Sequence, residues 1–290
     1  MKIVILGAGG RLGAALMREY REKYDLAGFN HAQLDLVNLD DARGKLGGMN
    51  FDVLINAAAF TNVDACETER DRAFRINAEA PNILAQICNE KDAKLIHFST
   101  DYVFDGEKRA PYTEDDQANP ISAYGESKLA GERNVLAAGD GNLVVRVSWV
   151  FGPDRPSFID AMIKRAQEDE KIDAISDKFS TPTYTHDIAR MLPQFFDRGV
   201  AGGLLHFANT GKCSWQEYAQ WALDCCRDAG ISLKATRVGA LTLKDMSSWL
   251  ARRPVYSVLS TAKYMVLTGS TPRAWREAVN EYITRFYSKK

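Results

Sequence analysis

A glycine-rich segment near the start of the chain constrains the fold more than any other feature of the sequence. It follows directly after the apolar run KIVIL at residues 2–6, reads GAGGRLG over residues 7–13, and leads into a helical pattern. Glycines allow a tight turn and let a pyrophosphate approach the amide groups at a helix N-terminus, where the helix dipole favours negative charge. The segment therefore predicts a strand, a turn and a helix that bind a dinucleotide, with a simple tight turn as the alternative.

Strand-length apolar runs alternate with helical patterns through the first half of the chain. The runs are rich in Val, Ile and Leu without clean alternation, which indicates strands buried on both faces of a parallel sheet. They lie at residues 2–6, 25–29, 52–59, 94–99 and 143–152. This pattern predicts an α/β fold with a Rossmann-like, doubly wound parallel sheet.

The rhythm of the sequence changes after Trp149 to longer, irregular connections. We expect residues 1–150 to form a dinucleotide-binding domain, to which part of residues 180–200 returns. Residues 151–290 are expected to form mainly a smaller α/β lobe that binds the substrate. This lobe would lie over the carboxyl edge of the sheet, where open α/β sheets bind their ligands.

The charge of the chain is nearly balanced, with 37 Lys and Arg against 38 Asp and Glu and a net charge of −1. Without a long run of one sign, neither nucleic acid nor an anionic membrane is an expected partner. The first residues hold too few apolar side chains for a signal peptide, and no run approaches a membrane-crossing length. We expect a cytoplasmic protein with a small-molecule ligand. The sequence leaves the oligomeric state open, and a homodimer is compatible with it.

The end of the second predicted strand indicates which dinucleotide binds. The acidic residue that usually holds the adenosine ribose is missing, because Phe29 is followed by Asn30 and His31. A 2′-phosphate is then not repelled, and Arg11 would attract it unless Arg11 is simply solvated. The sequence thus favours NADPH, with NADH as the alternative. Further expected cofactor contacts are Asp35 and Leu36 near the adenine, the run Ala57, Ala58 and Ala59 after the third strand, and the loop residues Gly7, Gly10, Leu12 and Gly13.

A hydroxyl, a phenol and an ammonium follow at the positions that carbonyl reduction requires. Thr100 ends the fourth predicted strand, and Tyr124 and Lys128 lie four residues apart in the helical segment ISAYGESKLAGE. Such a Tyr–Lys pair alone is often surface decoration, but downstream of a glycine loop the combination is far rarer. Hydride transfer to a ketone leaves an alkoxide, to which Tyr124 can give a proton. Thr100 would hold the carbonyl oxygen, while Lys128 would lower the pKa of Tyr124 and reach the cofactor ribose.

Several motifs, taken in order, resemble those of the dTDP-4-dehydrorhamnose reductase family. They are STDYVFDG, YGESK, VRVSWVFG and RRPVYSVLS, and the spacing of Gly7, Gly10 and Gly13 is that of the short-chain dehydrogenases and their extended relatives. The resemblance runs nearly end to end. It implies NADPH-dependent reduction of the 4-keto group of dTDP-4-dehydro-L-rhamnose to dTDP-L-rhamnose.

The resemblance also assigns roles to single residues. Thr100, Tyr124 and Lys128 match the catalytic hydroxyl, tyrosine and lysine of the family. The resemblance implies sugar contacts for Asp101, Tyr102 and Trp149, although core packing explains Trp149 about equally well. Arg253 is expected to contact the diphosphate as a bidentate donor, although an Arg beside a Pro is more often solvated.

The chain departs from the family at one motif, and rival functions stay open. Where the family often reads DQ-x-G-x-PT, this chain has Lys178 and Ser180, which leaves the contact at that motif undetermined. No metal site is predicted, because Glu19 and Glu281 fit no ligand spacing. The alternatives are another nucleotide-sugar epimerase or reductase, and a non-catalytic NADP-binding subunit like the regulatory β subunit of methionine adenosyltransferase.

Overall fold

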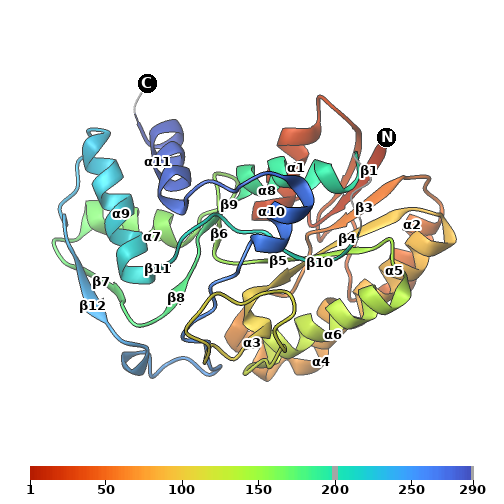
Figure 1. Ribbon diagram of the computed structural model, residues 1–290, viewed down its shortest axis with the longest axis horizontal. Helices are drawn as coiled ribbons and strands as arrows, with labels where there is room; N and C mark the ends of the chain where they lie inside the picture. The colour runs from red at the N-terminus through yellow and green to blue at the C-terminus, as the bar shows by residue number, and fades with distance from the viewer. Residues whose placement is uncertain (198–201, 289–290) are drawn as a thin grey trace.

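A computed structural model describes residues 1–197 and 202–288 of the chain, and a parallel sheet of six strands lies at its centre. The strand order is β10-β5-β4-β3-β1-β2, and each neighbouring pair is parallel (Figure 1). This sheet confirms the predicted α/β, doubly wound fold. Its strands are β1 (Lys2–Leu6), β2 (Asp25–Phe29), β3 (Val53–Asn56), β4 (Lys94–Thr100), β5 (Leu143–Val147) and β10 (Gly203–His206).

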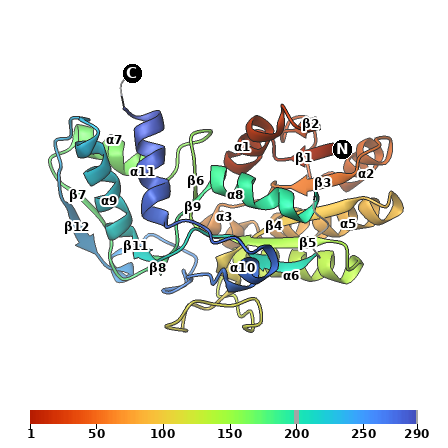
Figure 2. The same cartoon turned by 45° about the horizontal axis from the view of Figure 1, so that its top comes forward.

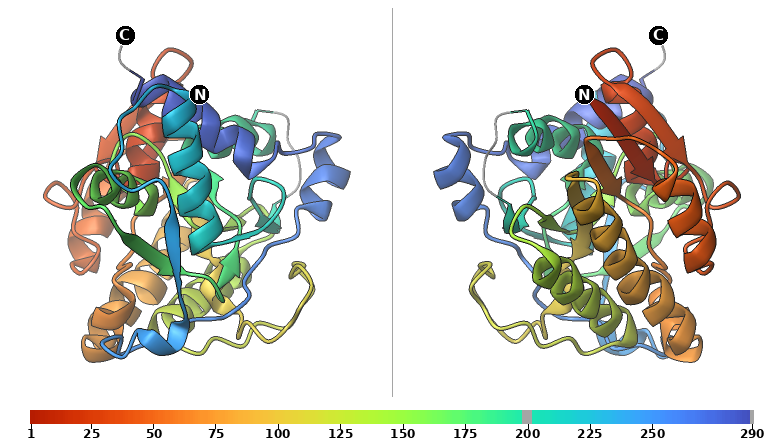
Figure 3. Two further views of the ribbon diagram at one scale, coloured as in Figure 1. Left: turned by 90° about the vertical axis from the view of Figure 1, so that its left-hand side faces the viewer. Right: turned by 90° about the vertical axis from the view of Figure 1, so that its right-hand side faces the viewer.

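Helices cover both faces of the sheet, because successive strand side chains point to opposite faces and are apolar on each. In β1, Ile3 and Ile5 pack into one layer, and Val4 and Leu6 pack into the other. Figures 1 and 2 show the two layers from the side, and Figure 3 shows them from the two ends. One layer holds α1 (Arg11–Tyr20), α8 (Thr185–Met191) and α10 (Ala262–Thr268), and the other holds α2 (Leu39–Gly47), α5 (Ala80–Glu90) and α6 (Ala123–Ala138).

A second lobe packs beyond the carboxyl ends of the strands (Figure 1). Aromatic side chains dominate its core, among them Phe151, Tyr184, Tyr218 and Trp275. The predicted domain division at residue 150 stays a prediction. Residues after 150 also supply the strand β10 to the sheet and the helices α8 and α10 to one of its helix layers. The lobe contains α7 (Phe158–Glu168), α9 (Trp215–Asp228), α11 (Trp275–Phe286) and the strand pairs β6 (Val150–Phe151) with β9 (Thr183–Tyr184), β7 (Ile172–Ile175) with β12 (Val238–Leu241), and β8 (Phe179–Ser180) with β11 (Cys213–Ser214).

A π-helical turn at Arg75–Glu79 sets the position of α6. It follows α3 (Val63–Thr68) and α4 (Arg70–Phe74) and leads into α5, whose first turn contains Pro81. Asn77, in the middle of this turn, accepts a hydrogen bond from the Phe60 N–H at 2.8 Å and donates to the Ser127 hydroxyl of α6 at 3.0 Å. Short 3₁₀ turns lie at Asp101–Val103, Leu192–Phe195 and Leu243–Asp245.

The five cysteines are free and buried. Within residues 1–197 and 202–288, the structure contains no helix with the length and apolar character needed to cross a membrane.

Gly131 tests the close contact between α6 and the π-helical turn. A Cβ at this position would lie 2.1 Å from the Asn77 carbonyl oxygen, a contact that backbone atoms cannot relieve without moving. We expect Gly131→Ala to lower the free energy of unfolding by about 1–3 kcal/mol in urea denaturation. Gly44→Ala in α2 is the matched control, because no atom of the described residues lies within 4 Å of a Cβ built there and alanine is the better helix former. Equal stability of the two variants would contradict the packing argument.

Candidate active site

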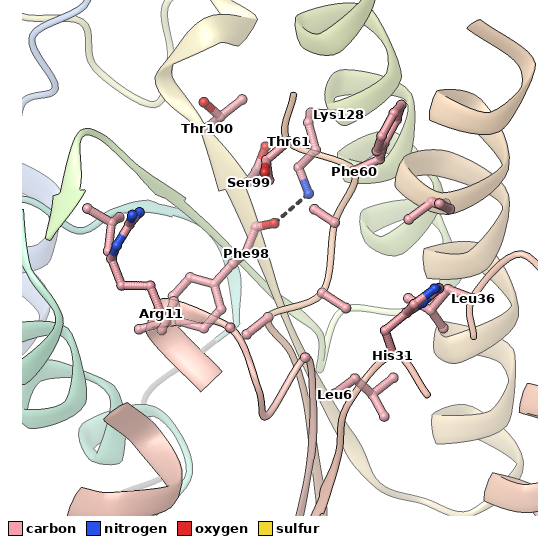
Figure 4. Close-up of a pocket in the computed structure, with 18 of the residues that line it drawn as sticks. Leu6, Arg11, His31, Leu36, Phe60, Thr61, Phe98, Ser99, Thr100 and Lys128 are labelled. Atoms are coloured by element: carbon pink, nitrogen blue, oxygen red, sulfur yellow. Dashed lines mark hydrogen bonds between the residues drawn. The ribbon is translucent and has the colours of Figure 1, made fainter. Parts of the chain in front are cut away.

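A pocket of about 1030 Å³ opens at the carboxyl ends of the strands, between the sheet and the second lobe. It is the site that parallel α/β sheets offer to ligands. Figure 4 shows part of its wall, with Thr100 and Lys128 toward one end and His31 and Leu36 toward the other. The predicted site residues that line it are Gly7, Gly10, Arg11, Leu12, Asn30, Asp35, Leu36, Ala57, Ala58, Ala59, Thr100, Asp101, Tyr102, Tyr124, Lys128 and Trp149.

The glycine loop forms the floor of the pocket. Gly7 has a φ of +75°, and a Cβ there would lie 2.8 Å from the Ala58 nitrogen, so only glycine fits. Gly10 begins α1 without a side-chain cap, which leaves the first N–H groups of the helix for an anion. Gly13 is not among the residues that line the pocket. A Cβ at Gly13 would lie 2.1 Å from the Gly7 carbonyl oxygen, so α1 can pack against the loop only because residue 13 is glycine.

The structure corrects the role predicted for Arg11. Its guanidinium donates hydrogen bonds to the backbone carbonyls of Arg155, at 3.2 Å, and Pro156. In Figure 4, Arg11 and His31 lie on opposite sides of the pocket. Arg11 therefore joins the loop to the second lobe rather than facing the end of β2. At that end, the Asn30 side chain accepts hydrogen bonds from the N–H groups of Ala32 and Gln33, so it shapes a turn and carries no charge.

Thr100 and Tyr124 meet at the edge of the sheet, as predicted. Thr100 is the last residue of β4, and Tyr124 lies in the first turn of α6, after the N-cap residue Ser122. Burial raises the pKa of Tyr124, and a hydrogen bond with the Thr100 hydroxyl partly opposes that shift. The phenol therefore keeps its proton at neutral pH.

Lys128 does not lower the pKa of Tyr124 in this structure, contrary to the expectation from their spacing. Its Nζ donates to the Phe98 carbonyl at 2.7 Å, the dashed bond in Figure 4, and lies 3.3 Å from His97 Nε2. Burial lowers the pKa of Lys128 to about 8, although Glu132 acts in the opposite direction. The ammonium is thus held at the pocket wall by the Phe98 carbonyl of β4, and burial is the main cause of the raised pKa of Tyr124.

His97 orients Lys128, a role that the sequence did not reveal. The ring is fully buried between Lys128 and Asn56, whose amide nitrogen lies 3.1 Å from Nδ1. Burial, followed by the charge of Lys128, holds the pKa of His97 well below its usual value. The neutral ring can accept a hydrogen bond from the lysine. A neutral imidazole accepts at one nitrogen only, so the ring accepts either from Lys128 at Nε2 or from the Asn56 amide at Nδ1.

Asp101 lines the pocket, but its carboxylate is bonded to protein hydroxyls. Oδ1 accepts from the Thr100 hydroxyl at 3.2 Å. Oδ2 accepts from Ser148 at 3.0 Å, from Ser180 at 3.2 Å and from Ser257. Only 2% of Asp101 is exposed, so the four donors replace water around the charge. The carboxylate therefore fixes the Thr100 side chain and joins it to three segments of the chain.

An aromatic wall lies next to this carboxylate. Tyr102 and Tyr124 form an edge-to-face pair with ring centroids 5.6 Å apart. Trp149 has a φ of +41°, packs on Trp215 at 5.7 Å, and also lines the pocket. Trp149 thus packs in the aromatic core and also faces the pocket, while its sugar contact stays a prediction. Its Nε1 is buried and has no hydrogen-bond partner within residues 1–197 and 202–288.

Lys178 lies behind the aromatic wall and is fully buried. Its Nζ donates to the Pro254 carbonyl at 2.7 Å and lies 5.0 Å from the centre of the Tyr102 ring and 5.9 Å from that of Trp149. Burial lowers the pKa of Lys178 to about 8, and the charge of Asp101 acts in the opposite direction. The lysine thus places a cation beneath the pocket wall and close to the buried carboxylate.

Arg253 does not line the pocket, contrary to the predicted diphosphate contact. Its two terminal nitrogens donate to the two carboxylate oxygens of Asp64, each at 2.8 Å. The pKa of Asp64 is lowered to about 2, chiefly by this hydrogen bond. The pair joins the C-terminal part of the chain to α3. Among the described residues, no three His, Cys, Asp or Glu side chains are grouped as metal ligands.

Comparisons with known proteins agree with this geometry. A family model described as the RmlD substrate binding domain matches residues 1–288. The dTDP-4-dehydrorhamnose reductase of Mycolicibacterium smegmatis is 39% identical over 97% of this chain and 85% of that protein. The chain belongs to the dTDP-4-dehydrorhamnose reductase family. The motif resemblance is thereby confirmed, and membership places the chain among the NAD(P)-dependent oxidoreductases.

Solved structures of the family superpose over nearly the whole chain. The dTDP-4-dehydrorhamnose reductase of Clostridium acetobutylicum has a TM-score of 0.92 and 34% identity, and the match covers 99% of this chain and 100% of that one. The enzyme of Bacillus anthracis, solved in complex with NADP, has a TM-score of 0.91 and 30% identity, with 98% and 99% of the two chains covered.

The pKa of Lys178 predicts how stability depends on pH in this member of the family. The unfolded chain holds the lysine proton up to about pH 10.5, whereas the folded chain releases it near pH 8. Between these two pH values the unfolded state binds more protons than the folded state, so the free energy of unfolding rises with pH. Below pH 8 the folded chain bears the full cost of burying the charged lysine, and this cost falls as the lysine loses its proton. We expect the free energy of unfolding of the wild type, relative to Lys178→Gln, to increase by about 3 kcal/mol between pH 8 and pH 10.5.

Urea unfolding of both proteins across this range measures the difference. Lys171→Gln is the control, because Lys171 is an exposed lysine just before β7. A difference between wild type and Lys178→Gln that does not change with pH would show that Lys178 stays charged when folded.

Proposed function

We propose that the chain reduces the 4-keto group of dTDP-4-dehydro-L-rhamnose to dTDP-L-rhamnose, with hydride from NADPH. One observation carries the proposal: the glycine loop, Thr100, Tyr124 and Lys128 line a single pocket. The relatives named dTDP-4-dehydrorhamnose reductase, and the complex of one such enzyme with NADP, support the substrate and the cofactor. We also propose a cytoplasmic location, while a homodimer stays a prediction.

The residues of the pocket fit a dinucleotide. Gly7 and the alanines after β3 leave backbone atoms as the surface of the loop, and the uncapped start of α1 offers N–H groups to a diphosphate. When bound, NADPH supplies the hydride. Within residues 1–197 and 202–288, Lys128 donates one hydrogen bond to a carbonyl and contacts one imidazole nitrogen. An ammonium has three N–H groups, so one remains for a ribose hydroxyl in the pocket.

Tyr124 is the proposed proton donor. The buried phenol stays protonated, which is the state that a donor to the carbonyl oxygen needs. Thr100 has a single hydroxyl proton, which it donates to Asp101 in this structure. We expect the Thr100 hydroxyl to turn to the carbonyl oxygen of the substrate. Two donors would then meet the oxygen on which negative charge develops.

Reduction of a related dTDP-sugar is the second candidate. The probable dTDP-4,6-dihydroxy-2-methyloxan-3-one 4-ketoreductase of Streptomyces antibioticus is 36% identical to this chain, close to the identity of the rhamnose enzymes. Lys178 also stands where the family motif DQ-x-G-x-PT often has glutamine. The cofactor and the proton donor would be the same for either sugar.

One assay tests the function. NADPH oxidation is followed at 340 nm while preceding pathway enzymes convert dTDP-glucose in situ, and the product is identified by mass spectrometry and NMR. Formation of dTDP-L-rhamnose supports the proposal. NADPH oxidation with another dTDP-sugar as product would support the second candidate, and no oxidation with any 4-keto sugar would reject both.

Tyr124→Phe tests the proton donor in the same assay. Removal of the phenol oxygen should lower kcat by about a hundredfold or more and leave the Kd for NADPH within about twofold, because the phenol acts on the substrate oxygen. Tyr24→Phe is the control, since it deletes a tyrosine hydroxyl bonded to Asp197, outside the pocket lining. Unchanged turnover in Tyr124→Phe would remove Tyr124 from the mechanism.

A further inference from the structure

A short segment of the second lobe crosses back over the glycine loop. It comprises residues 152–157, between β6 and α7. The segment both accepts hydrogen bonds from the glycine loop and donates one to it. Arg11 donates to the backbone carbonyls of Arg155 and Pro156, and the side chain of Arg155 returns to the loop, where Nε donates to the Gly9 carbonyl at 2.9 Å. The lobe thereby places a second arginine at the mouth of the pocket.

The guanidinium of Arg155 lies next to the end of β2. A Cβ built on Gly9 would be 3.3 Å from the Asn30 Cβ and 3.9 Å from Nη2 of Arg155, so both side chains flank Gly9. Arg155, Gly9 and Asn30 all line the pocket. In this fold the adenosine ribose lies beside the residue that follows the second strand, where an acid binds the 2′-hydroxyl and an arginine nearby accommodates a 2′-phosphate.

The charges around Arg155 leave it available to an anion. Asp154 is paired with Arg18, and Asp35 lies 3.5 Å from His31 Nδ1. Apart from the bond from Nε to Gly9, the Arg155 side chain makes no hydrogen bond or ion pair within residues 1–197 and 202–288. Its terminal nitrogens can therefore meet two phosphate oxygens, which is the geometry that arginine prefers.

We propose that Arg155 binds the 2′-phosphate of NADPH and sets the preference for NADPH over NADH. The inference rests on the proposed function and deepens it, since the role predicted for Arg11 passes to an arginine of the other lobe. The lobe expected to bind the sugar would then also contact the adenosine end of the cofactor. The uncharged Asn30 makes room for the phosphate, and Arg155 supplies the charge.

Calorimetric titration of NADPH and of NADH into the full chain tests the proposal. Arg155→Ala and Arg155→Gln keep the backbone carbonyl that accepts from Arg11, so they report on the guanidinium alone. Both should weaken NADPH binding by about tenfold to a hundredfold and leave NADH binding within about twofold. Arg165→Ala is the control, because Arg165 is an exposed arginine of α7 outside the pocket lining, and it should change neither affinity.

A second probe omits the nicotinamide. Adenosine 2′,5′-bisphosphate should lose affinity in both Arg155 variants, while 5′-AMP should not. If the variants bind NADPH and NADH equally weakly, Arg155 contacts the shared diphosphate or supports the loop, and the inference is overturned. Unchanged affinity for NADPH would overturn it as well. If the wild type binds neither dinucleotide, the proposed reductase function fails too. If the wild type reduces its substrate and the variants keep its cofactor preference, only this inference fails.

Discussion

The buried carboxylate of Asp101 is the interaction on which the site depends. A charge that is almost fully removed from water is costly unless hydrogen bonds replace the water. Here the hydroxyls of Thr100, Ser148, Ser180 and Ser257 do so, and they come from the ends of β4 and β5, from β8, and from the C-terminal part of the chain. The carboxylate therefore forces four distant segments to converge at the carboxyl edge of the sheet.

Three further polar contacts join distant segments of the chain near the pocket. Lys178 stands behind Tyr102 and Trp149, so the aromatic wall is backed by a cation that also stabilises the Asp101 charge. Arg253 pairs with Asp64 of α3, and Arg11 donates to carbonyls of the segment at residues 152–157. Polar contacts thus join distant parts of the chain near the pocket that lies between the sheet and the second lobe.

The features that depend on local pattern could be predicted from the sequence. Apolar strands and the glycine loop determine the sheet and the floor of the pocket, because both follow from side-chain periodicity and from the space that glycine leaves. Thr100 and Tyr124 met as expected, since one ends a strand and the other begins the next helix. Ser148 and Ser257 were missed although both lie within motifs that indicated the family, because a lone serine carries no sign of a buried partner.

The directions of long charged side chains could not be predicted. Arg11, Lys128 and Arg253 each have a partner far away in the sequence, namely residues 155–156, the carbonyl of Phe98 and Asp64. Spacing along a helix placed Lys128 beside Tyr124 but could not show that β4 offers the lysine a better acceptor. The raised pKa of Tyr124 could not be predicted either, because it follows from burial, which depends on the whole fold.

The central claim is that one pocket brings the nicotinamide, the sugar carbonyl and a protonated phenol together. The most direct measurement follows the hydride itself, with NADPH deuterated at the transferable position of the nicotinamide and the 4-keto nucleotide sugar as substrate. The account predicts a reduced sugar that carries deuterium at C4, detected by NMR and a mass increase of about one unit. A reduced product without deuterium at C4 would contradict it.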